Sequence, residues 1–277
     1  MAIKLMYITN KTEIAHIAES VGVDRIFVDM EYIGKAERQP GDTVKSHHTF
    51  DDISRIRATI SKAELLVRIN PWHEPSDIHV GSCVEIDESI KRGADIIMLP
   101  FFKTVDEARK FLDYVGGRTK TILLIETPEA VDCVDELLEL KGLDEVYVGL
   151  NDLSLGYGKK FMFEVLSDGT VEALCLKFRR RGVSYGFGGL ASLENGMVPG
   201  KMVLKEHYRL GSTSVILSRS FCNSERIKDL EAIKTIFNSE VKRIRDYEER
   251  CEEHANYFDE NRETIASIIE EIIGEKV

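Results

Sequence analysis

The chain has 277 residues, of which 43% are hydrophobic and 31% are charged. This length suits two small domains or one α/β barrel, and the composition is that of a soluble globular protein with a sizeable core. A formal net charge of −11 makes non-specific binding to nucleic acid or to an anionic membrane unfavourable, so neither is expected as a partner.

Eight short apolar segments alternate with helical patterns along the chain, and each segment is a predicted strand. Most of them lack strict alternation of apolar and polar residues, which is typical of strands covered on both faces. The predicted strands are residues 3–9, 25–31, 64–70, 95–102, 121–127, 145–152, 183–189 and 214–221.

Helical patterns fill the gaps between these segments. The segment TEIAHIAESVG has Thr12 as a candidate N-cap and stops at Gly22, TVDEARKFLDYVGG has Thr104 as its cap, and TPEAVDCVDELLELKG has Pro128 in its first turn. Eight strands with helical crossovers predict a closed (β/α)₈ barrel. An open doubly wound sheet is the alternative. No G-x-G-x-x-G follows the first strand, which weakens a dinucleotide-binding interpretation.

Two segments depart from the regular alternation. Residues 153–170 are longer than a usual connection and are predicted to be an active-site insertion. Residues 1–223 are expected to form the barrel domain, and residues 224–277 a C-terminal helical extension with an apolar stripe. The extension is predicted to pack on the barrel or on a neighbouring subunit, which favours a homo-oligomer. A lid is a further expectation for this extension, and an ordinary surface helical cap is the simpler alternative.

The five cysteines form no C-x-x-C pair, and their odd number argues against a disulfide framework. No apolar stretch approaches the length of a membrane span. We therefore expect a soluble protein of the reducing cytoplasm.

Polar residues gather where the predicted strands end, which is where barrel active sites are built. Arg68 and Glu126 lie at two of these ends, in LLVRINP and TILLIETPEAV. The strand ends also contain Asp29, Glu31, Asn70, Asn151, Asp152, Gly188, Gly189, Ser218, Arg219 and Ser220.

Glu126 and Asp152 end neighbouring strands, so their carboxylates are expected to converge. Two like charges at close range repel unless a cation binds between them. Mg²⁺ commonly takes one or two carboxylates and completes its shell with water and substrate oxygens, and Mn²⁺ or Co²⁺ would be tolerated similarly. The alternative is structural, with Glu126 capping the next helix and Asp152 pairing with Arg68.

Arg68 is an arginine embedded in a predicted buried strand. Its planar fork suits bidentate recognition of a carboxylate or an enolate. A structural ion pair with Glu31 or Glu126 is the other interpretation, and the two are compatible.

The segments LVRIN, GADIIMLPFFKTVDEAR, LLIETPEAV and VYVGLNDLSLGYG, in this order, resemble the HpcH/HpaI aldolase and citrate lyase family. The resemblance covers roughly residues 20–225 and implies a phosphoenolpyruvate/pyruvate-type TIM barrel. It also implies that Glu126 and Asp152 bind a metal ion. Arg68 is then the arginine that holds the pyruvyl oxygen and stabilises its enolate.

One departure from the family concerns the proton-transfer residue. Family aldolases commonly carry EH after the second strand, whereas this chain has Glu31 followed by Tyr32. A tyrosine, with an ordinary pKa of about 10, is a poorer base at neutral pH. Histidines 47 and 48 follow in the loop and are candidate replacements, so Glu31 and His48 join Arg68 as predicted catalytic residues.

Substrate contacts are predicted for Arg68, for Gly149 and Asn151, and for the last two strands. There Gly188, Gly189 and Ser218 occupy the place where many barrels bind phosphate. The alternative is that the glycines only permit close packing.

The leading expectation is a divalent-metal-dependent carbon–carbon lyase acting on a pyruvate-like 2-oxo acid and an aldehyde. A lyase for a phosphorylated or acyl-CoA substrate is one alternative. A Schiff-base aldolase using Lys103 is another. A catalytically silent barrel that serves as a scaffold is the non-enzymatic alternative, suggested by Tyr32 and the long helical extension.

Overall fold

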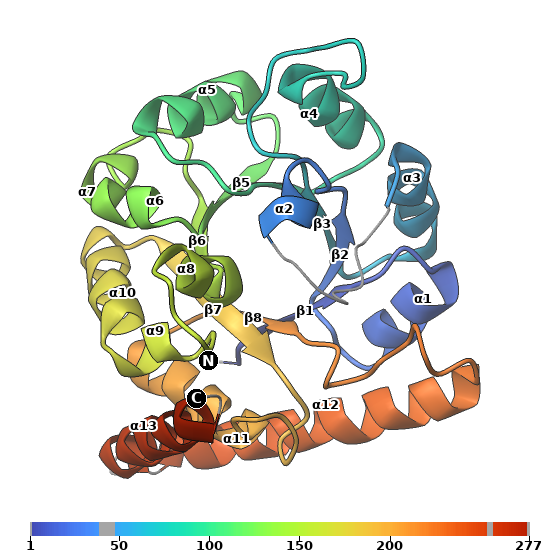
Figure 1. Cartoon of the computed structure of the whole chain (residues 1–277). Coiled ribbons are helices and arrows are strands. Elements are labelled where there is room, and N and C mark those ends of the chain that lie inside the picture. Colours follow the sequence, from blue (N-terminus) through green and yellow to red (C-terminus); the bar gives the residue numbers. More distant parts are fainter. Residues whose placement is uncertain (1, 39–47, 254–256, 276–277) are drawn as a thin grey trace.

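The computed structural model describes residues 2–38, 48–253 and 257–275. Eight parallel strands pair in chain order and close into a barrel surrounded by helices (Figure 1). β1 pairs with both β2 and β8, which completes the ring. The predicted (β/α)₈ barrel is therefore confirmed, and the open sheet is excluded.

All eight predicted strands are present, and most end before the polar residues that follow them. Those polar residues leave the sheet and form the rim of the barrel, which is why the strands are shorter than the apolar segments. The strands are β1 Lys4–Ile8, β2 Arg25–Asp29, β3 Glu64–Arg68, β4 Ile96–Leu99, β5 Lys120–Ile125, β6 Glu145–Val148, β7 Ser184–Leu190 and β8 Ser214–Leu217.

The helices that cover the barrel begin close to the predicted positions. Thr104 caps α5 as predicted, and Thr127 caps α6 by accepting a hydrogen bond from Ala130. Thr12 is the first residue of α1, so the N-cap position falls on Lys11 instead. The first eleven helices are α1 Thr12–Ser20, α2 Lys35–Arg38, α3 Phe50–Thr59, α4 Ser82–Lys91, α5 Val105–Val115, α6 Pro128–Asp132, α7 Val134–Leu137, α8 Leu150–Gly156, α9 Glu164–Ser167, α10 Thr170–Arg181 and α11 Gly200–Leu210.

Side chains that alternate along the strands divide the core into two parts. One set fills the barrel interior, and the other packs against the surrounding helices. At the first residues of β2, β3 and β6, the buried Arg25 binds Glu64 and Glu145. This ion-pair cluster lies at the amino ends of the strands. A catalytic site is therefore expected at the opposite, carboxyl end.

The predicted insertion at residues 153–170 is about half helical. It completes α8, contains α9 and begins α10. Asp152 therefore lies in the first turn of a helix, not at the end of strand β6 as the apolar pattern suggested. The strand ends at Val148 because Gly149 turns the chain into α8.

Two long helices, α12 Leu230–Glu253 and α13 Tyr257–Glu275, follow the barrel and lie along one side of it (Figure 1). α12 contacts α1 and α11, and α13 contacts α9 and α11. Glu248 accepts the Ile3 N–H at 2.8 Å, and Asn261 donates to Glu206 at 2.8 Å. The extension thus packs on its own barrel, whereas association with a second copy stays a prediction.

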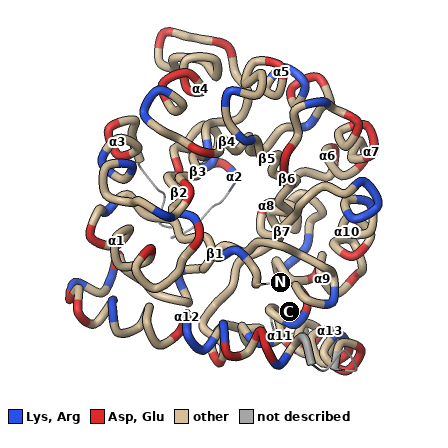
Figure 2. The backbone as a smooth tube through the Cα atoms, turned by 180° about the vertical axis from the view of Figure 1, so that it is seen from behind, with Lys and Arg blue, Asp and Glu red and all other residues tan. Residues whose placement is uncertain are grey.

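Acidic and basic residues are interspersed along the outer helices (Figure 2). Within the described part of the chain, no helix is both long and apolar enough to cross a membrane.

Candidate active site

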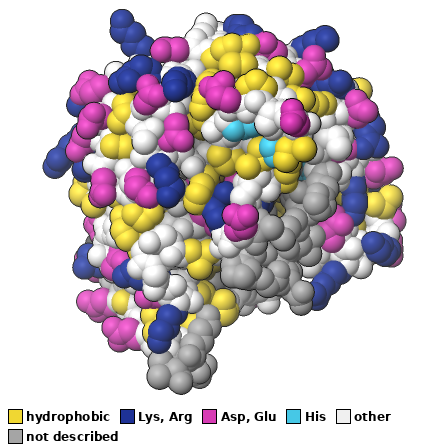
Figure 3. All heavy atoms as spheres, turned by 45° about the horizontal axis from the view of Figure 1, so that its top comes forward, with side chains coloured by type: hydrophobic (Ala, Val, Ile, Leu, Met, Phe, Trp, Pro, Cys, Tyr) yellow, Lys and Arg dark blue, Asp and Glu magenta, His cyan; other side chains and the backbone are white. Residues whose placement is uncertain are grey.

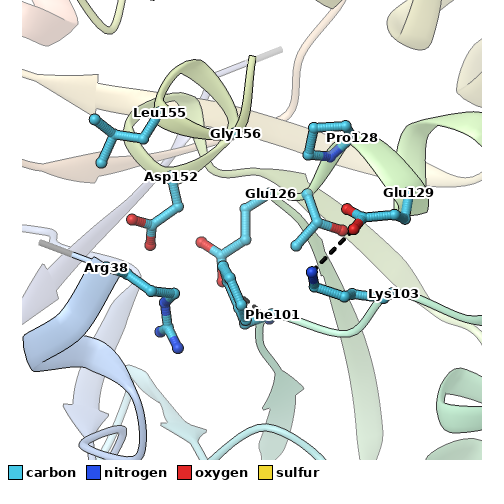
Figure 4. A pocket seen from close by; sticks show the side chains of 10 residues that line it. Arg38, Phe101, Lys103, Glu126, Pro128, Glu129, Asp152, Leu155 and Gly156 are labelled. Atoms are coloured by element: carbon cyan, nitrogen blue, oxygen red, sulfur yellow. Dashed lines mark hydrogen bonds and ion pairs between the residues drawn. The ribbon is translucent and has the colours of Figure 1, made fainter. Parts of the chain in front are cut away.

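A cavity of about 480 Å³ opens at the carboxyl ends of β4, β5 and β6. Figure 4 shows Glu126 and Asp152 pointing into the same space, with Arg38 and Phe101 beside them and Lys103 and Glu129 on the other side. The lining residues are Arg38, Phe101, Lys103, Glu126, Thr127, Pro128, Glu129, Asp152, Leu155 and Gly156.

Glu126 directly follows β5 and is only 3% exposed. Its Oε1 accepts a hydrogen bond from the Phe101 N–H at 3.0 Å. Burial raises the pKa of Glu126 well above its ordinary value, and the nearby Glu31 and Asp152 carboxylates raise it further. Arg68 and Arg38 oppose this effect only in part. A buried acid in this condition would be stabilised in its ionised form by a bound cation.

Two glycines bring α8, and hence Asp152, close to Glu126. A Cβ at Gly149 would lie 2.6 Å from Oε2 of Glu126, and a Cβ at Gly156 would lie 2.6 Å from Cδ of Pro128. Both distances are far below normal contact, so only glycine permits this approach of the helix. The predicted convergence of the two acids thus depends on Gly149, whose predicted substrate contact stays a prediction.

Arg68 is held by acids from the neighbouring strand. Its Nε and Nη2 donate to Oδ1 and Oδ2 of Asp29, both at 2.8 Å, and its Nη2 lies 3.4 Å from Glu31. Lys35 also donates to Asp29 at 2.8 Å. Burial alone would raise the pKa of Asp29, but Arg68 and Lys35 outweigh it and hold that pKa well below its usual range. The expected ion pair of Arg68 with Glu31 is present. The main partner of Arg68 is Asp29, which the sequence did not predict as a partner.

Glu31 is fully buried at the centre of this charged cluster. It binds Arg38 through Oε1, and its Oε2 lies 3.4 Å from both Lys35 and Arg68 without accepting a hydrogen bond in the described part of the chain. Glu31 also lies close enough to Glu126 to raise the pKa of that residue. The predicted catalytic acid therefore adjoins the metal-site candidate.

His48 contacts the backbone at the end of β2. Its Nδ1 accepts a hydrogen bond from the Asp29 N–H at 2.9 Å, and burial lowers the pKa of the ring. It is not among the described residues that line the cavity. A catalytic role for His48 stays a prediction, and His47 lies outside the described residues.

Tyr32, which stands where the resemblance led us to expect a histidine, faces the surface and is 49% exposed. Its hydroxyl shares a hydrogen bond with Nδ1 of His79 at 3.1 Å. Figure 3 shows histidine side chains next to apolar ones on the face of the molecule that it draws. Ile78 and Val80 are exposed near His79 in the chain.

None of the predicted substrate contacts, Arg68 included, is among the described residues that line this cavity. The half-buried Gly188 has a φ of 59° and accepts a hydrogen bond from Tyr147, and Ser218 donates its N–H to Leu190. Gly189 lies beside Ser218 across the β7–β8 pair, and Asn151 is exposed on α8. Their roles stay predictions.

Arg38 and Phe101 are the site residues that strand-end reasoning missed. Arg38 comes from α2, a helix of four residues. Such a short helix has too little periodicity for the sequence to show which way Arg38 points, although the sequence does place Arg38 in the loop after β2. Phe101 looked like one more apolar residue of the segment 95–102. Its left-handed backbone, with a φ of 47°, has no sequence signal because such a conformation usually belongs to glycine.

The closed barrel and the acidic cavity at the carboxyl ends of its strands are those of a (β/α)₈-barrel enzyme. The sequence matches the model of the HpcH/HpaI aldolase/citrate lyase family over residues 4–165, more than half of the chain. The chain belongs to this family, which comprises enzymes of the lyase type and is generally dependent on a divalent metal.

Solved structures of the same fold include two family members. An HpcH/HpaI aldolase from Desulfitobacterium hafniense is 19% identical with a TM-score of 0.60, and the match covers 87% of this chain and 92% of that chain. A family protein from Burkholderia cenocepacia is 15% identical with a TM-score of 0.62, covering 84% and 95%. A citrate synthase variant is 15% identical with a TM-score of 0.54, covering 78% and 85%. At these identities the likeness shows the fold alone. No curated protein matches the sequence.

The chemistry of the donors fits a hard divalent cation. Glu126 and Asp152 supply carboxylate oxygens, and no group of three or more acidic, histidine or cysteine side chains that could hold a metal ion is found among the described residues. Protein ligation of this limited kind suits Mg²⁺, which retains water and substrate oxygens in its shell.

Proposed function

We propose that this protein is a divalent-metal-dependent carbon–carbon lyase of the class II aldolase type. It would cleave or form a bond to a pyruvate-like 2-oxo acid through an enolate. The observation that carries the proposal is the burial of Glu126 beside Asp152 in one cavity, with its pKa raised by burial and by neighbouring acids. A bound cation would stabilise the ionised form of Glu126 beside Asp152, and Mg²⁺, Mn²⁺ or Co²⁺ could supply that charge.

Glu126 and Asp152 would hold the cation, which would supply Lewis-acid stabilisation of negative charge developing on the 2-oxo acid. Arg68 would stabilise the same charge from the side of β3. Asp29 occupies its Nε and Nη2, and within the described residues no hydrogen bond from Nη1 is found. This leaves one oriented donor for the substrate oxygen, without the cost of ordering a flexible side chain.

The local charges match a monoanionic substrate. Arg68, Lys35 and Arg38 surround Asp29 and Glu31, so three positive and two negative charges leave one positive charge on this side. A divalent cation would stabilise the ionised form of Glu126 beside Asp152. The remaining positive charge would be balanced by the single carboxylate of a 2-oxo acid.

Glu31 is better placed than His48 to exchange a proton. Its buried Oε2 accepts no hydrogen bond from the described residues, and the residue lies near Glu126. By contrast, Nδ1 of His48 is occupied by the backbone of β2. We propose that Glu31 carries the acid–base step, which typically contributes on the order of 10²–10⁴-fold to the rate.

The second half of the substrate would lie toward Pro128 and Leu155. The cavity of about 480 Å³ is within the usual range for small-molecule sites and exceeds the needs of a three-carbon acid. Lys103 lies at the rim in an ion pair with Glu129 at 2.9 Å, with half of its side chain exposed. This pairing favours the metal-dependent route over a Schiff base on Lys103.

A binding experiment tests the proposal without knowledge of the aldehyde. Mn²⁺ would be titrated calorimetrically into the metal-free wild type, Glu126→Gln, Asp152→Asn and the control Glu129→Gln. Loss of a direct ligand is expected to weaken Mn²⁺ binding by at least about tenfold, whereas the control, whose carboxylate binds Lys103, should stay close to wild type.

Turnover of a 4-hydroxy-2-oxo acid should disappear with chelator and return with Mn²⁺. Activity that survives exhaustive chelation would exclude the metal-dependent mechanism. Absence of any Mn²⁺ binding by the wild type would favour the silent scaffold instead.

A further inference from the structure

Phe101 has an unusual backbone conformation. It lies just after β4 and has a φ of 47°, and it is the one non-glycine residue with positive φ in the described part of the chain. The left-handed region is unfavourable for an L-residue, and for a bulky aromatic residue it is a genuine outlier. A conformation of this cost persists only where the surroundings determine it.

The backbone of Phe101 directs a hydrogen bond into the cavity. Its N–H donates to Oε1 of Glu126 at 3.0 Å, while the Thr127 hydroxyl donates to the Phe102 carbonyl at 2.8 Å. Two bonds of opposite direction thus join the residues after β4 to the residues after β5. With Oε1 bound in this way, Oε2 lies on the side of Gly149 and α8, from which Asp152 projects.

The ring of Phe101 supports a second residue of the cavity. The guanidinium carbon of Arg38 lies 3.7 Å from the ring centroid, well within cation–π range. Arg38 also binds Glu31, and its buried Nε has no hydrogen-bond partner in the described residues. Figure 4 shows Phe101 lying between Arg38 and Lys103, with Glu126 beside it. The aromatic face therefore limits where the Arg38 guanidinium can lie.

We propose that Phe101 is a positioning residue of this site: its left-handed backbone orients Glu126, and its ring holds Arg38 at the cavity wall. The effect on catalysis rests on the proposed function, whereas the two contacts themselves do not. Phe101 acts through Glu126 and Arg38 and takes no part in bond making.

A comparison of the stabilities of two variants tests the role of the Phe101 backbone conformation. Glycine adopts a φ of 47° without strain, whereas alanine adopts it at a cost, so Phe101→Gly should unfold at a higher denaturant concentration than Phe101→Ala. The matched pair lacks the ring in both members, so the comparison isolates the backbone. A Phe101→Ala variant as stable as Phe101→Gly would overturn the role of the backbone.

The variant Phe101→Leu tests the role of the aromatic ring. Phe101→Tyr, which keeps an aromatic ring, is the conservative variant that should restore wild-type behaviour. Leucine keeps the N–H to Glu126 but removes the aromatic face, so the Mn²⁺ affinity should stay within about threefold of wild type. The KM for a 2-oxo substrate should rise by about 2- to 30-fold, the range expected for a lost cation–π contact, and tyrosine should restore it. Equal KM values for all three proteins would overturn the role of the ring.

A double-mutant comparison with Arg38 shows whether the Phe101 ring acts by positioning Arg38 or only by packing. In an Arg38→Ala background, Phe101→Leu should change KM no further, whereas additive effects would show that the ring acts by another route. NMR offers a readout that needs neither metal nor turnover, since the Arg38 Nε–H signal should carry a ring-current shift that Phe101→Leu removes. If the wild type binds no Mn²⁺, the proposed function fails while the stability and NMR comparisons still decide the two contacts.

Discussion

Asp29 and Arg68 face each other in register as the last residues of β2 and β3 and join through two parallel hydrogen bonds of 2.8 Å. The carboxylate is buried, and its depressed pKa keeps it ionised beside the guanidinium. Removing one partner of such a pair leaves the other charge buried without compensation, which is more costly than losing the contact alone.

Asp29→Asn is therefore expected to lower the free energy of unfolding by about 3–5 kcal/mol and to raise the KM for the 2-oxo acid, because Arg68 loses its orientation. Urea denaturation and steady-state kinetics measure the two effects. Asp87→Asn is the control. Asp87 is a half-exposed acid bound to Arg118, and its loss should cost no more than about 1 kcal/mol. Equal stabilities of the two variants would show that the Asp29 pair is dispensable.

Gly149→Ala should weaken the metal site. The new Cβ would lie 2.6 Å from Oε2 of Glu126 and 2.8 Å from its Cβ, so the carboxylate or helix α8 must shift. We expect a fall in Mn²⁺ affinity of about tenfold and a loss of about 1–3 kcal/mol in stability. Calorimetry and thermal denaturation would be run beside Gly274→Ala, whose added Cβ meets nothing within 4 Å. Wild-type Mn²⁺ affinity in Gly149→Ala would contradict the close approach.

Tyr147→Phe should destabilise the barrel at the irregular β7–β8 pairing. The buried hydroxyl accepts the Ile216 N–H at 2.9 Å and donates to the Gly188 carbonyl at 2.6 Å, where the register shifts between Gly186 and Gly189. Leaving these groups unpaired should cost about 1–3 kcal/mol by urea denaturation. Tyr114→Phe, which removes a bond to the half-exposed Asp87, should cost less. The reverse order would refute a structural role for the Tyr147 hydroxyl.

His207 should make the protein lose stability in mild acid. The ring is buried and stacked on Phe187 with centroids 3.9 Å apart, and burial lowers its pKa from 6.5 to about 3. Below pH 6.5, His207 becomes protonated in the unfolded chain but stays neutral in the folded protein. This contribution to stability is therefore intact above about pH 6.5 and declines by about 1.4 kcal/mol per pH unit as the pH falls toward about 3.

The variant His207→Gln lacks this titration, so its stability should fall less steeply than that of the wild type between about pH 6 and about pH 4. Urea denaturation across this range gives the comparison directly. If the free energy of unfolding falls equally steeply with pH in the two proteins, the pKa of His207 is not lowered by its burial.

Local pattern was sufficient for the barrel and for part of the site. Apolar segments of strand length, separated by helical periods, predict eight strands wherever they appear in the chain. Because parallel strands share one carboxyl end, the position of Glu126 and Arg68 at strand ends already predicts that they lie on the same face. Asp152 was predicted near Glu126 for the same reason, although it lies in the first turn of a helix.

The sequence by itself determined the strands, the barrel and the acids and arginine at its mouth, since these depend on residue type and short-range spacing. Only the tertiary structure decided that Asp29 orients Arg68, that Phe101 contacts both Glu126 and Arg38, and that His48 turns to the backbone of β2. The contacts of Arg68 with Asp29 and of Phe101 with Glu126 join residues 39 and 25 positions apart, and they depend on strand register and side-chain direction, which no local pattern specifies.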